Sequence, residues 1–161
     1  MEVVDKKSHL WQYLAEDQRE LILDGEQLLT DVVHFKSVSD YSFLVFPFSK
    51  AYEGFLKQLF LDLDLIKEDE YYGDSIRIGR ILNPMFMKEH TSIYQKLCLH
   101  DKGGADVTDK LWQVWKKGRN QVFHYFPHNY RKLSFDEALG IIKEEIEVMT
   151  VAAAKCDISL P

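Results

Sequence analysis

The sequence has few cysteines, which are common in extracellular proteins, and no long hydrophobic run, which is common in membrane proteins. Its 161 residues include two cysteines, Cys98 and Cys156, whose separation suits neither a disulfide framework nor a cysteine-ligated metal site. We therefore expect reduced thiols in a cytoplasmic protein. No hydrophobic run reaches the length of a membrane span, and residues 1–7 lack the apolar core of a signal peptide, so we expect neither feature.

The remaining composition is that of an ordinary globular chain, 46% hydrophobic and 29% charged, and the length predicts a single domain over residues 1–161. The net charge of −6 argues against a nucleic-acid binder, but the charge is unevenly distributed. Residues 110–132 contain no Asp or Glu and hold six basic residues, Lys110, Lys116, Lys117, Arg119, Arg131 and Lys132. A phosphate backbone requires such a local basic segment, although chance clustering gives the same pattern.

Apolar residues recur at helical spacing over most of the chain, and no strand alternation is convincing, so the sequence predicts an all-α fold. Asp5 or Ser8 is expected to cap the first helix, and Pro47 to kink the second or to start it anew. Ser134 and Glu137 form a capping box for the last helix. The expected helices cover roughly residues 7–33, 40–65, 75–82, 91–99, 106 or 108 to 127, and 134–154, with turns at 66–74 and 101–104.

The most informative stretch is residues 119–124, Arg-Asn-Gln-Val-Phe-His, inside one of the expected helices. A His moves a proton near neutral pH, and an Arg binds phosphate with a planar fork of donors. Lys116, Asn120 and His124 are four positions apart and would share a polar face, from which the amide of Asn120 could orient Arg119 or His124. The opposite face carries a core-facing stripe of Leu111, Trp115, Gly118, Val122 and Phe126. The alternative is that Arg119 and His124 are ordinary surface residues.

A second polar stripe of Lys50, Glu53 and Lys57 lies on the helix expected at 40–65. Its simplest interpretation is a solvated face of weak ion pairs. His124 and His128 have the spacing of zinc ligands on a helix, but Pro127 interrupts the helix there and no acidic residue is near in sequence. We therefore expect no metal, and His34, His90 and His100 form no cluster in the sequence.

Residues 118–125, Gly-Arg-Asn-Gln-Val-Phe-His-Tyr, lie on the penultimate long helix of an all-helical chain and resemble the HEPN superfamily. Its signature is an Arg, usually a polar residue next, and a His four to six positions after the Arg. Residues 46–57 are similar to the corresponding stretch of the C-terminal HEPN domain of the RnlA (RNase LS) toxin family, which pairs an Arg-x-x-Glu with the Arg-x4-His. The matching residues here are Lys50, Glu53, Arg119 and His124. Lys50 departs from the family's Arg and loses the bidentate fork.

The resemblance covers roughly residues 8–155 and implies a HEPN-like bundle of about five to seven helices with two long antiparallel helices at its core. It implies a homodimer with two motifs facing one cleft, and a metal-independent endoribonuclease without cofactor. Such a protein would be the toxin of a toxin–antitoxin or phage-defence system, with a protein antitoxin as partner. A Tyr two positions after the His, which a partner nucleotidyltransferase modifies in related toxins, is replaced by Phe126.

In this interpretation His124 is the general base or acid, and Arg119 holds the scissile phosphate. Asn120 orients one of them, and Glu53 sets the charge of His124 or carries the second proton. The expected RNA contacts are Lys50, Lys116, Lys117, His128, Arg131 and Lys132 on the backbone, with Tyr125 and Tyr130 stacking on bases. Two alternatives remain open. One is a non-catalytic HEPN module for RNA binding, assembly or partnership with another toxin, and the other is a helical adaptor with a chance motif.

Overall fold

The computed structural model describes residues 1–35, 37–89, 92–99 and 104–156, and within these ranges the protein is all-α, as the sequence predicts, with no strand. It has more helices than the five to seven expected, because short helices separate the long ones. The α-helices are α1 (His9–Tyr13), α2 (Glu16–Asp31), α3 (Phe46–Asp62), α4 (Glu68–Tyr72), α5 (Ile78–Ile81), α6 (Tyr94–Leu99), α7 (Gly104–Trp115) and α8 (Phe135–Lys155). Each helix in the described ranges is too short or too polar to cross a bilayer.

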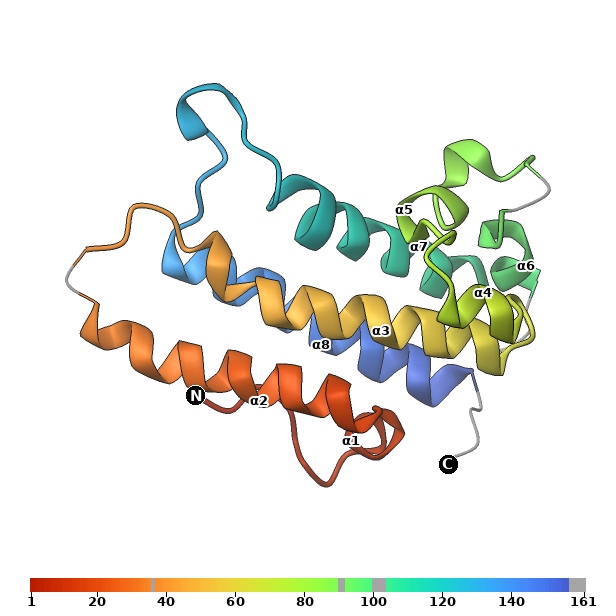
Figure 1. Ribbon diagram of the computed structural model, residues 1–161, viewed down its shortest axis with the longest axis horizontal. Coiled ribbons are helices and arrows are strands. Elements are labelled where there is room, and N and C mark those ends of the chain that lie inside the picture. The colour runs from red at the N-terminus through yellow and green to blue at the C-terminus, as the bar shows by residue number, and fades with distance from the viewer. Residues whose placement is uncertain (36, 90–91, 100–103, 157–161) are drawn as a thin grey trace.

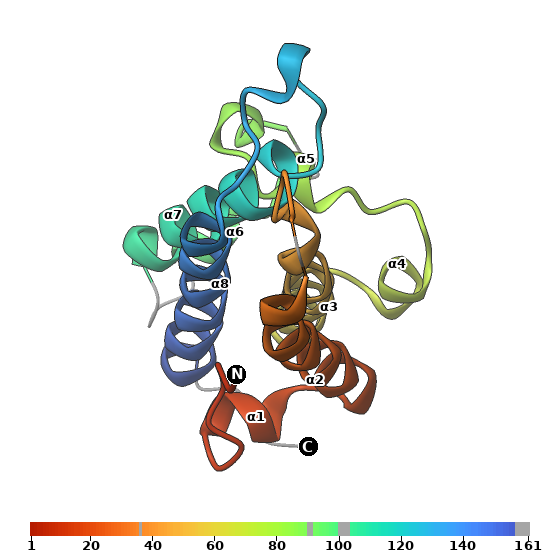
Figure 2. The ribbon, with the colours of Figure 1, turned by 90° about the vertical axis from the view of Figure 1, so that its left-hand side faces the viewer.

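The long helices α2, α3 and α8 pack together, and α7 lies along α8 (Figure 1). Helix α2 runs antiparallel to α3, and α7 antiparallel to α8, whereas α3 and α8 begin at the same end of the molecule (Figure 1). Seen along these helices, α2 flanks α3, α7 flanks α8, and α1 closes one side (Figure 2). Two antiparallel pairs thus take the place of the single pair expected at the core.

Helix α3 is the centre of the core because apolar side chains surround it. Its fully buried side chains are Phe48, Ala51, Tyr52, Phe55, Leu56, Leu59 and Phe60. Burial of each large apolar side chain contributes roughly 1.5–3 kcal/mol before entropy is counted. The buried hydroxyl of Tyr52 donates to the carbonyl oxygen of Leu111 at 2.8 Å and so fixes α7 against α3.

The N-terminal helical region is split, which the sequence periodicity does not predict. Ser8 caps α1, as one of the two expected caps, by accepting a hydrogen bond from the Trp11 amide. Leu14 then turns extended, with φ −60° and ψ 136°, and the Gln18 side chain accepts from the Ala15 amide to start α2. The apolar repeat continues across the break, so the two helices look like one in sequence.

The other helix boundaries follow the sequence in part. Helix α3 begins at Phe46 with Pro47 in its first turn, so proline starts the helix anew and does not kink it. Ser134 and Glu137 form the expected capping box of α8. Helix α4 occupies a segment expected to be a turn. Helix α7 starts at Gly104, so the prediction that residue 106 or 108 caps it is wrong. Of the expected 101–104 turn, residues 101–103 lie outside the described part, as do His90 and His100.

The end of α7 differs most from expectation. The α-helix stops at Trp115 and continues as a π-helical turn over Lys116–Gln121, called the π turn below, followed by a bend at residues 122–124. The prediction of a regular helix to residue 127 is therefore wrong. Lys116, Asn120 and His124 do not form one α-helical stripe, because a π turn advances with i to i+5 hydrogen bonds. Its residues 119 and 120 are the first two of the Arg-x4-His motif.

Candidate active site

An open pocket of about 700 Å³ lies between α3, the π turn and the segment around α5. All four side chains predicted to be catalytic line this pocket, namely Glu53, Arg119, Asn120 and His124. We call it the Arg119 pocket. Helix α3 supplies Glu53, the π turn supplies Arg119 and Asn120, and the bend after the π turn supplies His124. Glu53 thus lies on the same surface as the other three residues, although it is 66 or more positions away from them in sequence.

Glu53 and Arg119 form an ion pair, with 3.5 Å between Glu53 Oε2 and Arg119 Nε. About a third of each side chain is exposed to solvent, so the pair contributes less than about 1 kcal/mol. The Arg119 guanidinium also lies 5.4 Å from the centre of the Phe123 ring. These contacts keep the guanidinium at the pocket.

The π turn is attached to the core through a buried polar cluster. Ser49 Oγ of α3 lies 3.1 Å from the carbonyl oxygen of Gly118 and 2.6 Å from Glu145 Oε1 of α8. Both side chains are buried, and Gly118 is the residue before Arg119. A Cβ at position 118 would overlap the Glu145 carboxyl, so only glycine lets the turn approach this closely.

Burial raises the pKa of Glu145 to about 8, although its hydrogen bond with Ser49 acts in the opposite direction. The carboxyl is therefore neutral at pH 7. Ser49 Oγ carries one proton and lies within hydrogen-bond distance of two acceptors, Glu145 Oε1 and the Gly118 carbonyl oxygen. The second oxygen of Glu145, Oε2, is buried and has no partner among the described residues, which costs less for a neutral group than for a charged one. Ser49 thus links the buried carboxyl of α8 to the backbone next to Arg119.

Asn120 and the Trp115 indole both lie close to Gly79 of α5. A Cβ built on Gly79 would be 2.9 Å from Trp115 Nε1 and 3.8 Å from Asn120 Oδ1. The indole N–H is buried and has no hydrogen-bond partner in the described chain. Within that part of the chain no hydrogen bond joins Asn120 to Arg119 or His124, so its expected orienting role stays a prediction.

His124 is exposed and lies on the pocket lining. The described residues place no hydrogen-bond partner on either imidazole nitrogen. The ring is therefore accessible to a substrate, and its orientation is not fixed by Glu53, whose carboxylate is engaged with Arg119.

Of the residues expected to bind RNA, Lys50 lies nearest to this site. It lines an adjoining hollow of about 150 Å³ that shares Glu53, Arg119 and Phe123 with the Arg119 pocket. Lys116 and Lys117 line a different hollow of about 290 Å³, where Lys117 Nζ is 2.6 Å from Glu144 Oε1. Lys117 is therefore partly neutralised.

The remaining expected RNA contacts lie on the loop between the π turn and α8, which projects from the bundle (Figure 1). They are Tyr125, His128, Tyr130, Arg131 and Lys132, all exposed. The Arg131 guanidinium lies 4.0 Å from the centre of the Phe126 ring. At the base of the loop Asp40 accepts from the Asn129 amide at 2.9 Å and the Leu133 N–H at 3.1 Å. Although burial opposes the effect, hydrogen bonds lower the pKa of Asp40 to about 2, so this anchor stays charged at neutral pH.

Four residues at this site were not expected from the sequence. Arg77, Arg80 and Phe86 line the pocket opposite the motif, and Glu145 supports the π turn from behind. Arg77 and Arg80 gave no periodic signal because α5 is only four residues long. Glu145 did have a periodic signal of burial, since it lies four positions after Ile141 and four before Met149, both of which are buried.

Among the described residues no three His, Cys, Asp or Glu side chains converge as metal ligands would. Comparison of the chain with protein-family models, with curated proteins and with solved structures finds no match. The site must therefore be interpreted from its own geometry.

Proposed function

We propose that the protein is a metal-independent endoribonuclease with a HEPN-like fold, acting as the toxin of a toxin–antitoxin or phage-defence system. One observation carries the proposal. Glu53, Arg119, Asn120 and His124, selected from two separate sequence motifs, line one open pocket. The helical bundle with the motif at the end of α7 and a closing helix α8 is consistent with the HEPN resemblance.

The proposed reaction is transesterification of RNA. The 2′-oxygen forms a bond to the adjacent phosphorus, the bond from phosphorus to the 5′-oxygen breaks, and the products end in a 2′,3′-cyclic phosphate and a 5′-hydroxyl. A base takes the proton of the 2′-hydroxyl, and an acid protonates the leaving 5′-oxygen. Arg119 binds the phosphate and its developing charge in place of the Glu53 carboxylate.

His124 is one of the two proton carriers, because it is the accessible imidazole on the pocket. The second is either Glu53, once Arg119 has turned to the phosphate, or the His124 of a second copy facing the same cleft in a homodimer. Lys50 in the adjoining hollow attracts the backbone without the bidentate geometry of an arginine. An antitoxin would act by covering this surface.

A non-catalytic RNA-binding or assembly module is the second candidate. It is favoured by the ion pair that occupies Arg119 and by the lack of a described group that orients His124. In that case the same pocket would bind RNA without cleaving it.

The test is incubation of the purified protein with labelled single-stranded RNA in EDTA, with analysis of the product ends. The variant is His124→Ala, and the matched control is His9→Ala, which removes an exposed histidine from α1. We expect cyclic phosphate ends from the wild type and the control, and none from His124→Ala. RNA binding without cleavage would support the module, and equal cleavage by all three proteins would remove His124 from the mechanism.

A further inference from the structure

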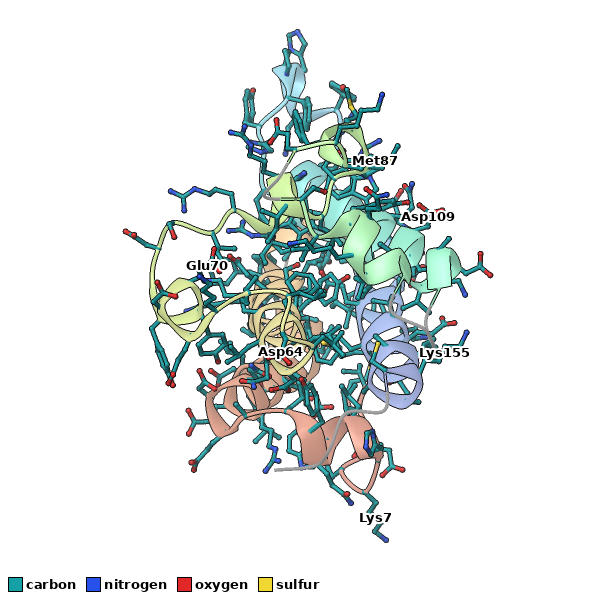
Figure 3. All side chains as sticks on the ribbon, turned by 90° about the vertical axis from the view of Figure 1, so that its right-hand side faces the viewer. Lys7, Asp64, Glu70, Met87, Asp109 and Lys155 are labelled. Carbon is teal, nitrogen blue, oxygen red and sulfur yellow. The ribbon has the colours of Figure 1, made fainter. Side chains whose placement is uncertain are left out.

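The Arg119 pocket has a second wall that the motif does not include. Residues 76–80, on and before α5, and Phe86 of the following 3-10 turn (Pro84–Phe86) face the π turn across the pocket. Met87, the next residue, lies in the same half of the molecule as the 122–133 loop and far from Lys7 (Figure 3). We call this the opposite wall, and the side with Glu53, Arg119, Asn120 and His124 the motif wall.

Packing fixes the opposite wall to the core. Ile78 and Leu82 are buried, and the Ile93 amide donates to the Ile81 carbonyl at 2.9 Å. Gly79 lets the backbone of α5 rest on the Trp115 indole at the end of α7, where a Cβ would come within 2.9 Å of Nε1. Packing against the core therefore sets the position of this wall.

Arg77 is the arginine on this pocket whose charge is least compensated. Arg119 pairs with Glu53 at 3.5 Å, and Arg80 pairs with Glu89 at 3.1 Å. Arg77 Nη1 donates to the backbone carbonyl of Asp74 at 2.8 Å, and none of the described carboxylates lies within ion-pair distance of it. That one bond holds the side chain and leaves most of its five N–H donors for an anion.

Aromatic rings lie on both walls. Phe86 is 37% exposed, and the Arg80 guanidinium lies 5.7 Å from its ring centre. Across the pocket Arg119 and Phe123 make the corresponding pair at 5.4 Å. Unpaired bases stack on such rings and on arginine planes, whereas the bases of a duplex are already stacked on each other.

We propose that the opposite wall holds the nucleotide next to the scissile phosphate, with Arg77 binding the neighbouring phosphate and Phe86 stacking on its base. This inference rests on the proposed function, since it assumes that RNA occupies the motif wall. It makes the preferred substrate an unpaired RNA segment with at least two phosphates inside the pocket. Arg80 supports the ring of Phe86 and stays paired with Glu89.

The test compares Arg77→Gln and Phe86→Ala with the wild type and with Lys7→Gln, which removes one exposed charge far from the pocket. Binding of an unpaired RNA 12-mer is measured by fluorescence anisotropy over a range of NaCl concentrations, and kcat and KM by cleavage of the same RNA. Circular dichroism melting checks that each variant folds. Restoring the ring with Phe86→Trp separates stacking from packing.

Arg77→Gln should weaken binding about tenfold at low salt and lower the slope of log K against log salt by about one, because one phosphate contact is lost. KM should rise by a similar factor while kcat stays within about threefold of wild type. Phe86→Ala should weaken binding by about tenfold without changing the slope, and Phe86→Trp should restore it. Lys7→Gln should behave as wild type, and a duplex of the same sequence should bind more weakly than the unpaired strand.

The failures of the two proposals are distinguishable. Wild-type cleavage together with unchanged binding by Arg77→Gln would overturn the inference and leave the proposed function standing. Binding that depends on Arg77, without any cleavage, would support the inference and overturn the nuclease. An equal loss of binding in Lys7→Gln, or tighter binding of the duplex, would overturn the inference.

Discussion

The two walls of the Arg119 pocket are built in different ways. The motif wall depends on long helices, since its π turn is held by a hydroxyl of α3 and a buried carboxyl of α8 through Ser49, Gly118 and Glu145. The opposite wall depends on a four-residue helix that rests on Trp115, and its polar side chains are exposed.

Under the proposed function, the two walls would have different roles. Groups that take part in bond making need a defined position, and the buried contact of Ser49 with the Gly118 carbonyl fixes the backbone next to Arg119. Groups that bind substrate can lie on a short exposed element, where a change in charge does not disturb the core. We therefore expect substitutions behind the motif wall to change stability and kcat, and substitutions on the opposite wall to change mainly KM.

The largest effects are expected when the side chains proposed to be catalytic are removed from the motif wall. His124→Ala and Arg119→Ala should each lower kcat by roughly 10²- to 10⁴-fold, because a proton carrier or the phosphate clamp is lost. The melting temperature should change little, since both side chains are at least partly exposed. Single-turnover cleavage and thermal melting provide the two readouts. A loss of less than tenfold in both variants would contradict the assignment of the motif wall.

Glu145→Gln tests the buried cluster behind this wall. Because burial raises the pKa of Glu145 from its ordinary 4.5 to about 8, the folded protein keeps a proton that the unfolded chain releases. Wild-type stability should therefore fall as pH rises from about 4.5 to 8 and then level off. Glutamine lacks this titration, so relative to wild type the variant should gain on the order of 3 kcal/mol between pH 5 and 8.

Urea unfolding at several pH values measures this difference. Glu147→Gln serves as the control, because this carboxylate lies on the same helix and is exposed. A pH-independent difference between Glu145→Gln and wild type would mean that the buried carboxyl is charged throughout.

Gly118→Ala tests the close approach of the π turn to α8. The added Cβ overlaps the Glu145 carboxyl, so we expect a loss of roughly 1–3 kcal/mol and a lower kcat as Arg119 moves. Gly140→Ala is the matched control, because a Cβ there meets nothing within 4 Å inside helix α8. It should be neutral or stabilise the helix by up to about 1 kcal/mol. Equal effects of the two substitutions in urea unfolding would contradict the cluster.

The smallest expected effect is on the opposite wall. Gly79→Ala places a Cβ 2.9 Å from Trp115 Nε1, so α5 must shift by a few tenths of an ångström. We expect KM to rise about threefold with kcat nearly unchanged, and less than about 1 kcal/mol of destabilisation because the shift is small. Steady-state kinetics separates the two parameters. A larger effect on kcat than on KM would show that the two walls are not separate in function.

Much of the motif wall was predictable because its residues lie in long segments with clear apolar periodicity. The stripe through Leu111 and Trp115 identified the motif helix, and Lys50 with Glu53 stood out against the apolar side of α3. The π turn was not predictable. Val122 continues the apolar repeat past it, and the contact of Gly118 with Glu145 is a tertiary one.

The opposite wall was predictable only as secondary structure. Helix α5 lies inside the helix expected at 75–82, but it spans about one turn, which is too few residues to show which face meets the core. Its position depends on Gly79 meeting Trp115, two residues far apart in the chain. The same limit explains the missed α4 and the unrecognised break at Leu14, where local hydrogen bonds decide the boundary.

The central claim is that the Arg119 pocket cleaves RNA through the substrate's own 2′-hydroxyl. The most direct measurement compares a single-stranded RNA in EDTA with the same sequence made with 2′-deoxyribose throughout, using binding and single-turnover cleavage for both strands. We expect both strands to bind and only the RNA to be cut, leaving a cyclic phosphate. Cleavage of the deoxy strand, or RNA products ending in a 3′-hydroxyl, would contradict it.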